Sequence, residues 1–92
     1  MDNGKGLRAS IEERIKQILI SELEIKASLL AESNLSTPLL GRGIGLDSVE
    51  TLTLVAGIEK EFDIQVDDED LTVELFKNLG TLAEYVSKKV TA

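Results

Sequence analysis

The chain of 92 residues contains no cysteine, no histidine and no tryptophan. Without cysteine it can form no disulfide, no thiolate metal site and no cysteine nucleophile. Without histidine it lacks the commonest general base and the commonest side-chain ligand of transition metals. Carboxylates and lysines remain, but most hydrolase and transferase active sites are excluded. We therefore expect a protein that is not an enzyme and has no metal site of its own.

Long apolar runs are also missing, since no stretch approaches the roughly 20 residues that span a bilayer. The first ten residues are polar and contain glycine, so they do not resemble the apolar core of a signal peptide. A chain of this length forms one domain. We place that domain at residues 1–92, with residues 1–9 disordered. We expect a cytoplasmic monomer without membrane insertion.

The net charge of −7 argues against a nucleic-acid partner, because phosphates require a basic surface. Residues 1–46 hold six basic and six acidic side chains, and residues 71–92 have a net charge of +1. The imbalance in charge therefore lies in residues 47–70, which hold nine acidic residues and one basic residue, Lys60. This asymmetry favours a surface that meets basic partners, although an acidic face that keeps the protein soluble explains it equally well. The nine acids are Asp47, Glu50, Glu59, Glu61, Asp63, Asp67, Asp68, Glu69 and Asp70.

The first predicted helix is marked by a capping-box pattern, in which the Ser10 hydroxyl and the Glu13 carboxylate satisfy each other's backbone amides. Aliphatic residues at helical spacing predict a helix from about Ile11 to Ile25, extending as far as Leu30. A long loop over residues 31–47 follows. Its apolar side chains are expected to be buried against the bundle, and they are Leu35, Leu39, Leu40, Ile44 and Leu46.

The second predicted helix begins at Asp47 or Ser48 and ends near Asp63. At 100° per residue, Val49 falls on the polar side and is predicted to be exposed, whereas Glu59 falls within the apolar arc. We attribute the position of Glu59 to fraying near the helix end. The side chains expected to face inward are Leu54, Ile58, Thr51, Phe62, Val55, Leu52 and Ala56.

Two further helices complete the predicted fold. Residues 64–66 are expected to place two side chains in the bundle, and the acids from Asp67 are expected to begin a short third helix. Asn78 is predicted to cap a last helix from Leu79 to about Val90. The fold class is all-α, a four-helix bundle of three main helices, one short third helix and a long loop between the first two. The apolar residues of the last two helices are Leu71, Val73, Leu75, Phe76, Leu79, Leu82, Ala83, Val86 and Val90.

Asp47 and Ser48 stand at a predicted helix start, directly after Gly45 and Leu46. The free amides of a first helical turn and the helix dipole favour an anion, so a serine here is suited to carry a phosphodiester. Aspartate and serine are also the ordinary N-cap residues. On this dipeptide alone, a simple helix cap is the better explanation.

The segments around the dipeptide carry a family resemblance. Residues 45–49, Gly-Leu-Asp-Ser-Val, resemble the Asp-Ser-Leu signature of acyl and peptidyl carrier proteins. Phe62-Asp63-Ile64-Gln65-Val66 resembles the end of the second helix in that family, residues 67–70 its acidic third-helix start, and residues 78–82 its fourth-helix entry. These segments occur in the family's order and spacing, and the resemblance covers residues 10–90. The chain thus resembles an acyl carrier protein.

The resemblance implies a specific chemistry. Ser48 would receive 4′-phosphopantetheine from coenzyme A in the presence of Mg²⁺, with Asp47 helping to position that ion. The arm would carry acyl groups as thioesters for fatty-acid or specialised lipid or polyketide-like biosynthesis, and the apolar arc of the second helix would shelter the acyl chain. The implied partners are a phosphopantetheinyl transferase and acyl-transferring and synthase enzymes with basic docking surfaces. We expect these enzymes to dock on Val49, Glu50 and Glu61.

Two alternatives remain open. A peptidyl or D-alanyl carrier protein would share the serine signature, although the acid-rich second helix argues against a peptidyl carrier. A non-catalytic acidic adaptor or calcium-binding helical protein would depend on residues 67–70. Calcium loops of the EF-hand kind need acids at alternating positions and a central glycine. Four consecutive acids without a glycine do not fit that pattern.

Overall fold

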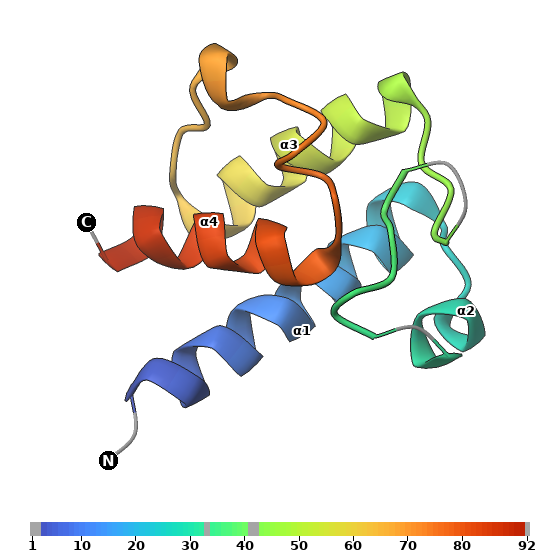
Figure 1. The fold of residues 1–92 in the computed structure, drawn as a ribbon, viewed down its shortest axis with the longest axis horizontal. Coiled ribbons are helices and arrows are strands. Elements are labelled where there is room, and N and C mark those ends of the chain that lie inside the picture. The colour runs from blue at the N-terminus through green and yellow to red at the C-terminus, as the bar shows by residue number, and fades with distance from the viewer. Residues whose placement is uncertain (1–2, 33, 41–42, 92) are drawn as a thin grey trace.

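The computed structural model describes residues 3–32, 34–40 and 43–91, with the side chains of residues 10–31, 34–40 and 43–91. These residues contain helices and no strand, and the predicted all-α bundle is confirmed (Figure 1). α1 packs against both α3 and α4, while α2 lies to one side. None of the helices so described is long and apolar enough to cross a membrane. The elements are α1 (Asn3–Leu23), α2 (Ala27–Glu32), α3 (Ser48–Phe62), the 3₁₀ helix η1 (Asp68–Asp70) and α4 (Leu79–Thr91).

α1 begins earlier than predicted. Ser10 lies inside the helix, so the proposed capping box with Glu13 is wrong. The helix already includes residues 3–9, which we expected to be disordered, while Met1 and Asp2 lie outside the described residues. Residues 7–9, Leu-Arg-Ala, all have high helix propensity. The helix therefore continues through Ser10 although the sequence there fits a capping box.

α1 also ends earlier than predicted, at Leu23 instead of Ile25 or Leu30. Glu24 has a positive φ of 55°, and the Ile25 amide donates to the Leu19 carbonyl at 3.0 Å. This is the Schellman arrangement, which closes a helix with one left-handed residue. The aliphatic spacing continues into the separate helix α2, and for this reason the periodicity alone did not reveal the break.

The loop before α3 buries only part of the predicted apolar set. Leu39, Ile44 and Leu46 are buried and Leu40 is partly buried, whereas Leu35 is exposed. The Leu35 carbonyl instead accepts a hydrogen bond from the Gly80 amide at 3.0 Å. The backbone at this position thus contacts the start of α4 while the side chain faces outward.

α3 matches its predicted bounds, from Ser48 to Phe62. Leu54, Val55 and Ile58 are buried as predicted, but Leu52 and Ala56 are exposed. The buried part of the helix is therefore narrower than the predicted arc, because α1 is the main helix that α3 contacts.

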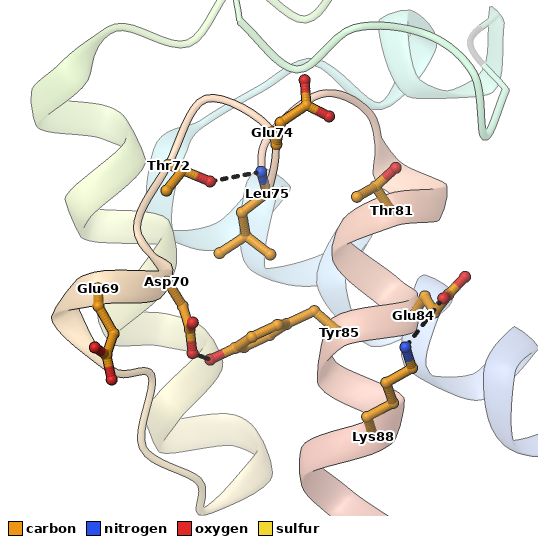
Figure 2. A pocket seen from close by; sticks show the side chains of 9 residues that line it. All are labelled: Glu69, Asp70, Thr72, Glu74, Leu75, Thr81, Glu84, Tyr85 and Lys88. Atoms are coloured by element: carbon orange, nitrogen blue, oxygen red, sulfur yellow. Dashed lines mark hydrogen bonds and ion pairs between the residues drawn. The ribbon is translucent and has the colours of Figure 1, made fainter.

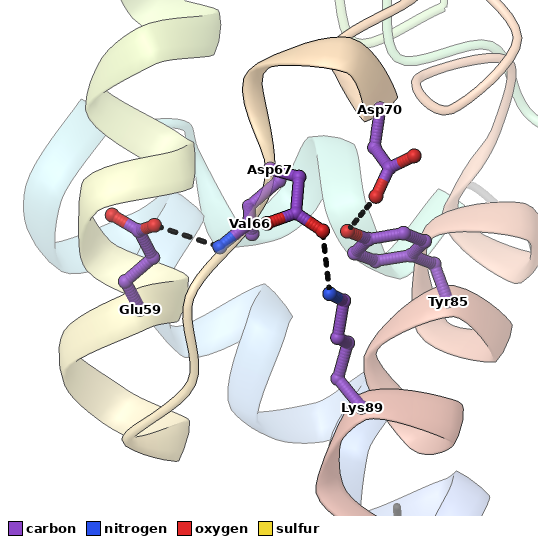
Figure 3. A network of polar contacts seen from close by, with 6 residues as sticks. All are labelled: Glu59, Val66, Asp67, Asp70, Tyr85 and Lys89. Atoms are coloured by element: carbon purple, nitrogen blue, oxygen red, sulfur yellow. Dashed lines mark hydrogen bonds and ion pairs between the residues drawn. The ribbon is translucent and has the colours of Figure 1, made fainter.

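The explanation offered for Glu59 is wrong. The helix continues to Phe62, and the Glu59 Oε2 atom accepts a hydrogen bond from the Val66 amide at 2.8 Å (Figure 3). The carboxylate therefore lies on the inner side of α3 because it satisfies the backbone of the returning chain. Val66 is buried beside it and Ile64 is partly buried, which confirms the prediction for residues 64–66.

The short third helix is reduced to the three residues of η1, and residues 72–77 form turns. The amides of Leu75, Phe76 and Lys77 each donate to the carbonyl three residues earlier. Leu75 and Phe76 are buried, whereas Val73 is exposed. We call residues 63–78 the connecting segment, because they rise from the end of α3 and descend to α4 (Figure 1).

Side chains of α4 hold the connecting segment in place (Figure 3). Tyr85 Oη donates to Asp70 Oδ2 at 2.7 Å, and Lys89 Nζ lies 3.2 Å from Asp67 Oδ2. α4 itself starts as predicted, because Asn78 Oδ1 accepts from the Thr81 amide at 2.7 Å. Its predicted inward residues are buried except for Val90, which is exposed in the last turn; those buried are Leu79, Leu82, Ala83 and Val86.

The close approach of α1 and α3 predicts that Gly57→Ala destabilises the fold. A Cβ at Gly57 would lie 2.7 Å from Ile18 Cγ2, and a β-branched side chain cannot easily move away. Overpacking of about 1–3 kcal/mol should exceed the roughly 1 kcal/mol that alanine gains in helix propensity. We expect the melting temperature to fall by roughly 5 °C. Thr53→Ala, at an exposed site of the same helix, should change it little, and an equal or higher melting temperature for Gly57→Ala would contradict the packing argument.

Tyr85 is the only tyrosine, so phenolate absorbance reports this group alone. Partial burial, and next the hydrogen bond to Asp70, raise the pKa of its phenol above 10.0. The folded protein therefore retains a proton that the unfolded chain releases. The resulting stabilisation is complete below pH 10 and is lost as the pH rises through the folded pKa. Titration in buffer and in urea should give the higher midpoint in buffer.

Asp70→Asn should lower the folded midpoint of this titration, because the carboxylate charge beside the phenol is removed. Asp68→Asn removes the charge of a neighbouring exposed acid and serves as the control. Equal midpoints for wild type and Asp70→Asn would show that the hydrogen bond to Asp70 does not form in solution.

Candidate functional site

Ser48 is the first residue of α3 and is exposed. Asp47 caps this helix, since its Oδ1 atom accepts from the Glu50 amide at 2.7 Å. The Glu50 Oε1 atom in turn accepts from the Asp47 amide at 3.1 Å, which completes a capping box. The predicted helix start is confirmed, and Glu50, which was predicted only as a docking residue, also completes the helix cap. The spacing Asp-x-x-Glu was the signal for its second role.

Backbone hydrogen bonds join the two described parts of the loop that enters α3. The Ile44 amide donates to the Pro38 carbonyl at 2.9 Å, and the Leu46 amide donates to the Leu39 carbonyl at 2.8 Å. Gly43 has a φ of +59°, and a Cβ there would collide with the Pro38 carbonyl oxygen. Only glycine fits this close approach.

A groove of about 420 Å³ opens beside Ser48. We call it the Ser48 groove. α3, the loop before it and the connecting segment form its walls. Four polar residues, Asp47, Ser48, Thr51 and Thr72, line part of it. The other described residues that line it are apolar, and they are Leu40, Leu46, Leu52, Leu71, Val73 and Phe76.

The groove lies on a different side of α3 from the one that the sequence analysis favoured for an acyl chain. The arc of Leu54, Val55 and Ile58 is filled by core packing. Leu52, which was predicted to face inward, is 61% exposed and lines the groove instead. The groove walls contributed by the connecting segment were missed, because Val73 was expected in a helix. In the sequence, Val73 stands between the polar residues Thr72 and Glu74, and this pattern was the available indication of its position in the groove.

The three predicted docking residues differ in their surroundings. Val49 is 69% exposed, as predicted. Glu61 is engaged by Arg14, whose Nε lies 2.8 Å from Glu61 Oε2 and whose Nη2 donates to the Glu61 carbonyl at 2.9 Å. The Arg14 guanidinium also lies 4.3 Å from the centre of the Phe62 ring. Val49 and Glu61 are twelve residues apart, about 18 Å along the helix axis and about 120° around it, so the structure does not bring them together.

A second hollow, of about 440 Å³, lies on the other side of the connecting segment, against α4 (Figure 2). Its lining is acidic and includes Glu69, Asp70, Glu74 and Glu84, with Lys88 lying 3.4 Å from Glu84 Oε1. The acids do not converge as metal ligands, since the described residues contain no group of three or more that could hold an ion. This observation gives no support to the calcium-binding alternative.

The residues at the start of α3 fit a covalently attached phosphopantetheine. Ser48 presents an exposed hydroxyl, the first turn of α3 favours an anion, and an apolar groove begins at the same residue. Asp47 uses one carboxylate oxygen as the helix cap and keeps a second oxygen.

Comparisons with known proteins agree with this arrangement. Residues 13–86 match the family described as phosphopantetheine attachment site. The chain is 32% identical over 80 residues to the acyl carrier proteins of two strains of Buchnera aphidicola subsp. Acyrthosiphon pisum, Tuc7 and APS. The aligned part covers 87% of this chain and 92% of each relative. No solved structure matches the chain significantly.

The family match and the two relatives cover most of the chain, including α3 and the Ser48 groove. Proteins of this kind bear a phosphopantetheine cofactor and act as carriers, not as catalysts. Because these matches cover most of the chain, and because the chain folds as a helical bundle, we conclude that it belongs to the acyl carrier protein family.

Proposed function

We propose that Ser48 is the attachment site, and that the protein carries aliphatic acyl groups on a 4′-phosphopantetheine arm bound there. The observation that carries this proposal is the position of Ser48 at the start of α3, exposed and at the edge of an apolar groove. Once attached, the arm supplies the thiol that the cysteine-free chain lacks and holds acyl groups as thioesters.

The residues around Ser48 have distinct tasks in this proposal. The first-turn amides and dipole of α3 stabilise the negative phosphodiester. Asp47 holds the first turn in place through the Glu50 amide, and its second oxygen helps to position Mg²⁺ during arm transfer. Thr51 lines the groove one helical turn after Asp47, where its Oγ1 donates to the Asp47 carbonyl at 2.8 Å.

The groove favours an acyl group over an aminoacyl or peptidyl group. Six of the ten described residues that line it are apolar. An aliphatic chain gains free energy by leaving water for such a surface, whereas the charged amine of an amino acid does not. The groove therefore supports a role in fatty-acid or specialised lipid or polyketide-like biosynthesis more than one as a peptidyl or D-alanyl carrier.

The proposed partners are a phosphopantetheinyl transferase and acyl-transferring and synthase enzymes with basic docking surfaces. Val49 is a large exposed apolar side chain next to Ser48, and Glu50 and Glu61 add negative charge along α3. We propose that these three residues are the docking surface of a cytoplasmic monomer that neither binds nucleic acid nor inserts into membranes.

Ser48→Ala should abolish the attachment of the arm. Incubation with coenzyme A, Mg²⁺ and a promiscuous transferase should add the mass of one phosphopantetheine to wild type and to the control Ser36→Ala, which changes an exposed loop serine. Intact-mass measurement should show no addition to Ser48→Ala, although its circular dichroism stays helical. A modified Ser48→Ala protein would place the attachment elsewhere.

Neutralising Glu50 and Glu61 together as glutamines should slow arm transfer by the transferase at low salt, by about tenfold, because charge steering acts on the encounter rate. Glutamine at position 50 still accepts the Asp47 amide, so the helix cap survives. Asp68→Asn with Glu69→Gln makes the same change in net charge on η1, away from Ser48, and is the matched control. The difference between the two double variants should shrink as salt rises, and equal rates at low salt would exclude α3 as the docking surface.

A further inference from the structure

The Ser48 groove has a neighbour of about 300 Å³, which we call the outer hollow. Among the residues that the structure describes, three side chains line both of them, those of Leu40, Val73 and Phe76. The boundary between the two spaces therefore lies at these three residues. The outer hollow adds one further apolar residue, Pro38, and the charged pair Glu74 and Lys77.

The three boundary residues are not equally fixed. Phe76 is 4% exposed and belongs to the core. Leu40 is partly buried, and its backbone pairs with Leu46 in the loop that enters α3. Val73 is 75% exposed and lies in a turn of the connecting segment. Val73 is thus the boundary side chain with the fewest packing restraints.

The arm and the acyl chain would share the Ser48 groove, whose volume is about 420 Å³ and part of which is open to solvent. The arm itself needs some of this space. The apolar surface that continues from the groove is the outer hollow, which is reached past Leu40 and Val73.

We propose that Val73 determines the length of the acyl chain that the protein can shelter. Short chains lie within the Ser48 groove, and the end of a long chain passes Val73 into the outer hollow. This inference rests on the proposed attachment of the arm to Ser48. It assigns Val73 to specificity and not to partner docking or to the stability of the core.

The test uses the full chain with acyl-phosphopantetheine transferred from a series of acyl-coenzyme A substrates, from butanoyl to hexadecanoyl. Cleavage of the thioester by hydroxylamine measures exposure of the bound group, and the melting temperature of the loaded protein is the second readout. In wild type, cleavage should slow by up to about fourfold for each methylene that becomes buried. This slowing should continue for chains too long for the Ser48 groove alone.

Val73→Trp should block the passage, so that protection and melting temperature stop rising at a shorter chain than in wild type. Val73→Phe should give an intermediate limit. Val90→Trp, at another exposed valine that lines neither space, is the matched control and should keep the wild-type limit. The same limit in wild type and both Val73 variants would overturn the role of Val73. Absence of any mass gain on loading would overturn the proposed attachment together with this inference.

Discussion

The capping box at the start of α3 is the interaction on which the site depends. Asp47 and Glu50 satisfy each other's amides, and a cap of this kind stabilises a helix by about 1 kcal/mol. Ser48, Thr51 and Leu52 all line the groove from the first turns of α3, so fraying there would displace them together. A domain of this size has little stability to spare. Directly before this cap, the Ile44 and Leu46 amides donate to the Pro38 and Leu39 carbonyls, and Gly43 permits the close approach to Pro38.

The acids concentrated in residues 47–70 serve the fold as well as any partner. Glu59 accepts a hydrogen bond from a backbone amide, Asp67 pairs with Lys89, and Asp70 accepts one from the Tyr85 hydroxyl (Figure 3). Glu61 pairs with Arg14. Exposed ion pairs contribute at most about 1 kcal/mol each, and the bonds of Glu59, Asp67 and Asp70 fix the position of the connecting segment. The acidic residues of this surface therefore also form bonds that hold the chain in place.

The connecting segment separates two hollows, the acidic hollow and the Ser48 groove. The acidic hollow faces α4, and the Ser48 groove faces α3. Leu75 and Phe76 of this segment are buried in the core, while Thr72, Val73 and Glu74 are exposed. Because the segment forms turns and not an α-helix, its apolar residues need not share one helical face. That freedom lets Val73 line the groove while Leu75 and Phe76 lie in the core.

The sequence by itself determined the helical class, the bounds of α3, the cap at Asn78 and the exposed position of Val49, because each depends on local spacing or on the chemistry of a helix end. Tertiary structure decided what local patterns leave open. Glu24 ends α1 with one left-handed residue although the aliphatic spacing continues, and Glu59 lies on the inner side because Val66 returns beside it. The groove exists only where Leu40, Leu52 and Val73 meet from three separate segments. No periodicity within one segment encodes such a meeting, since it depends on the packing of the segments against one another.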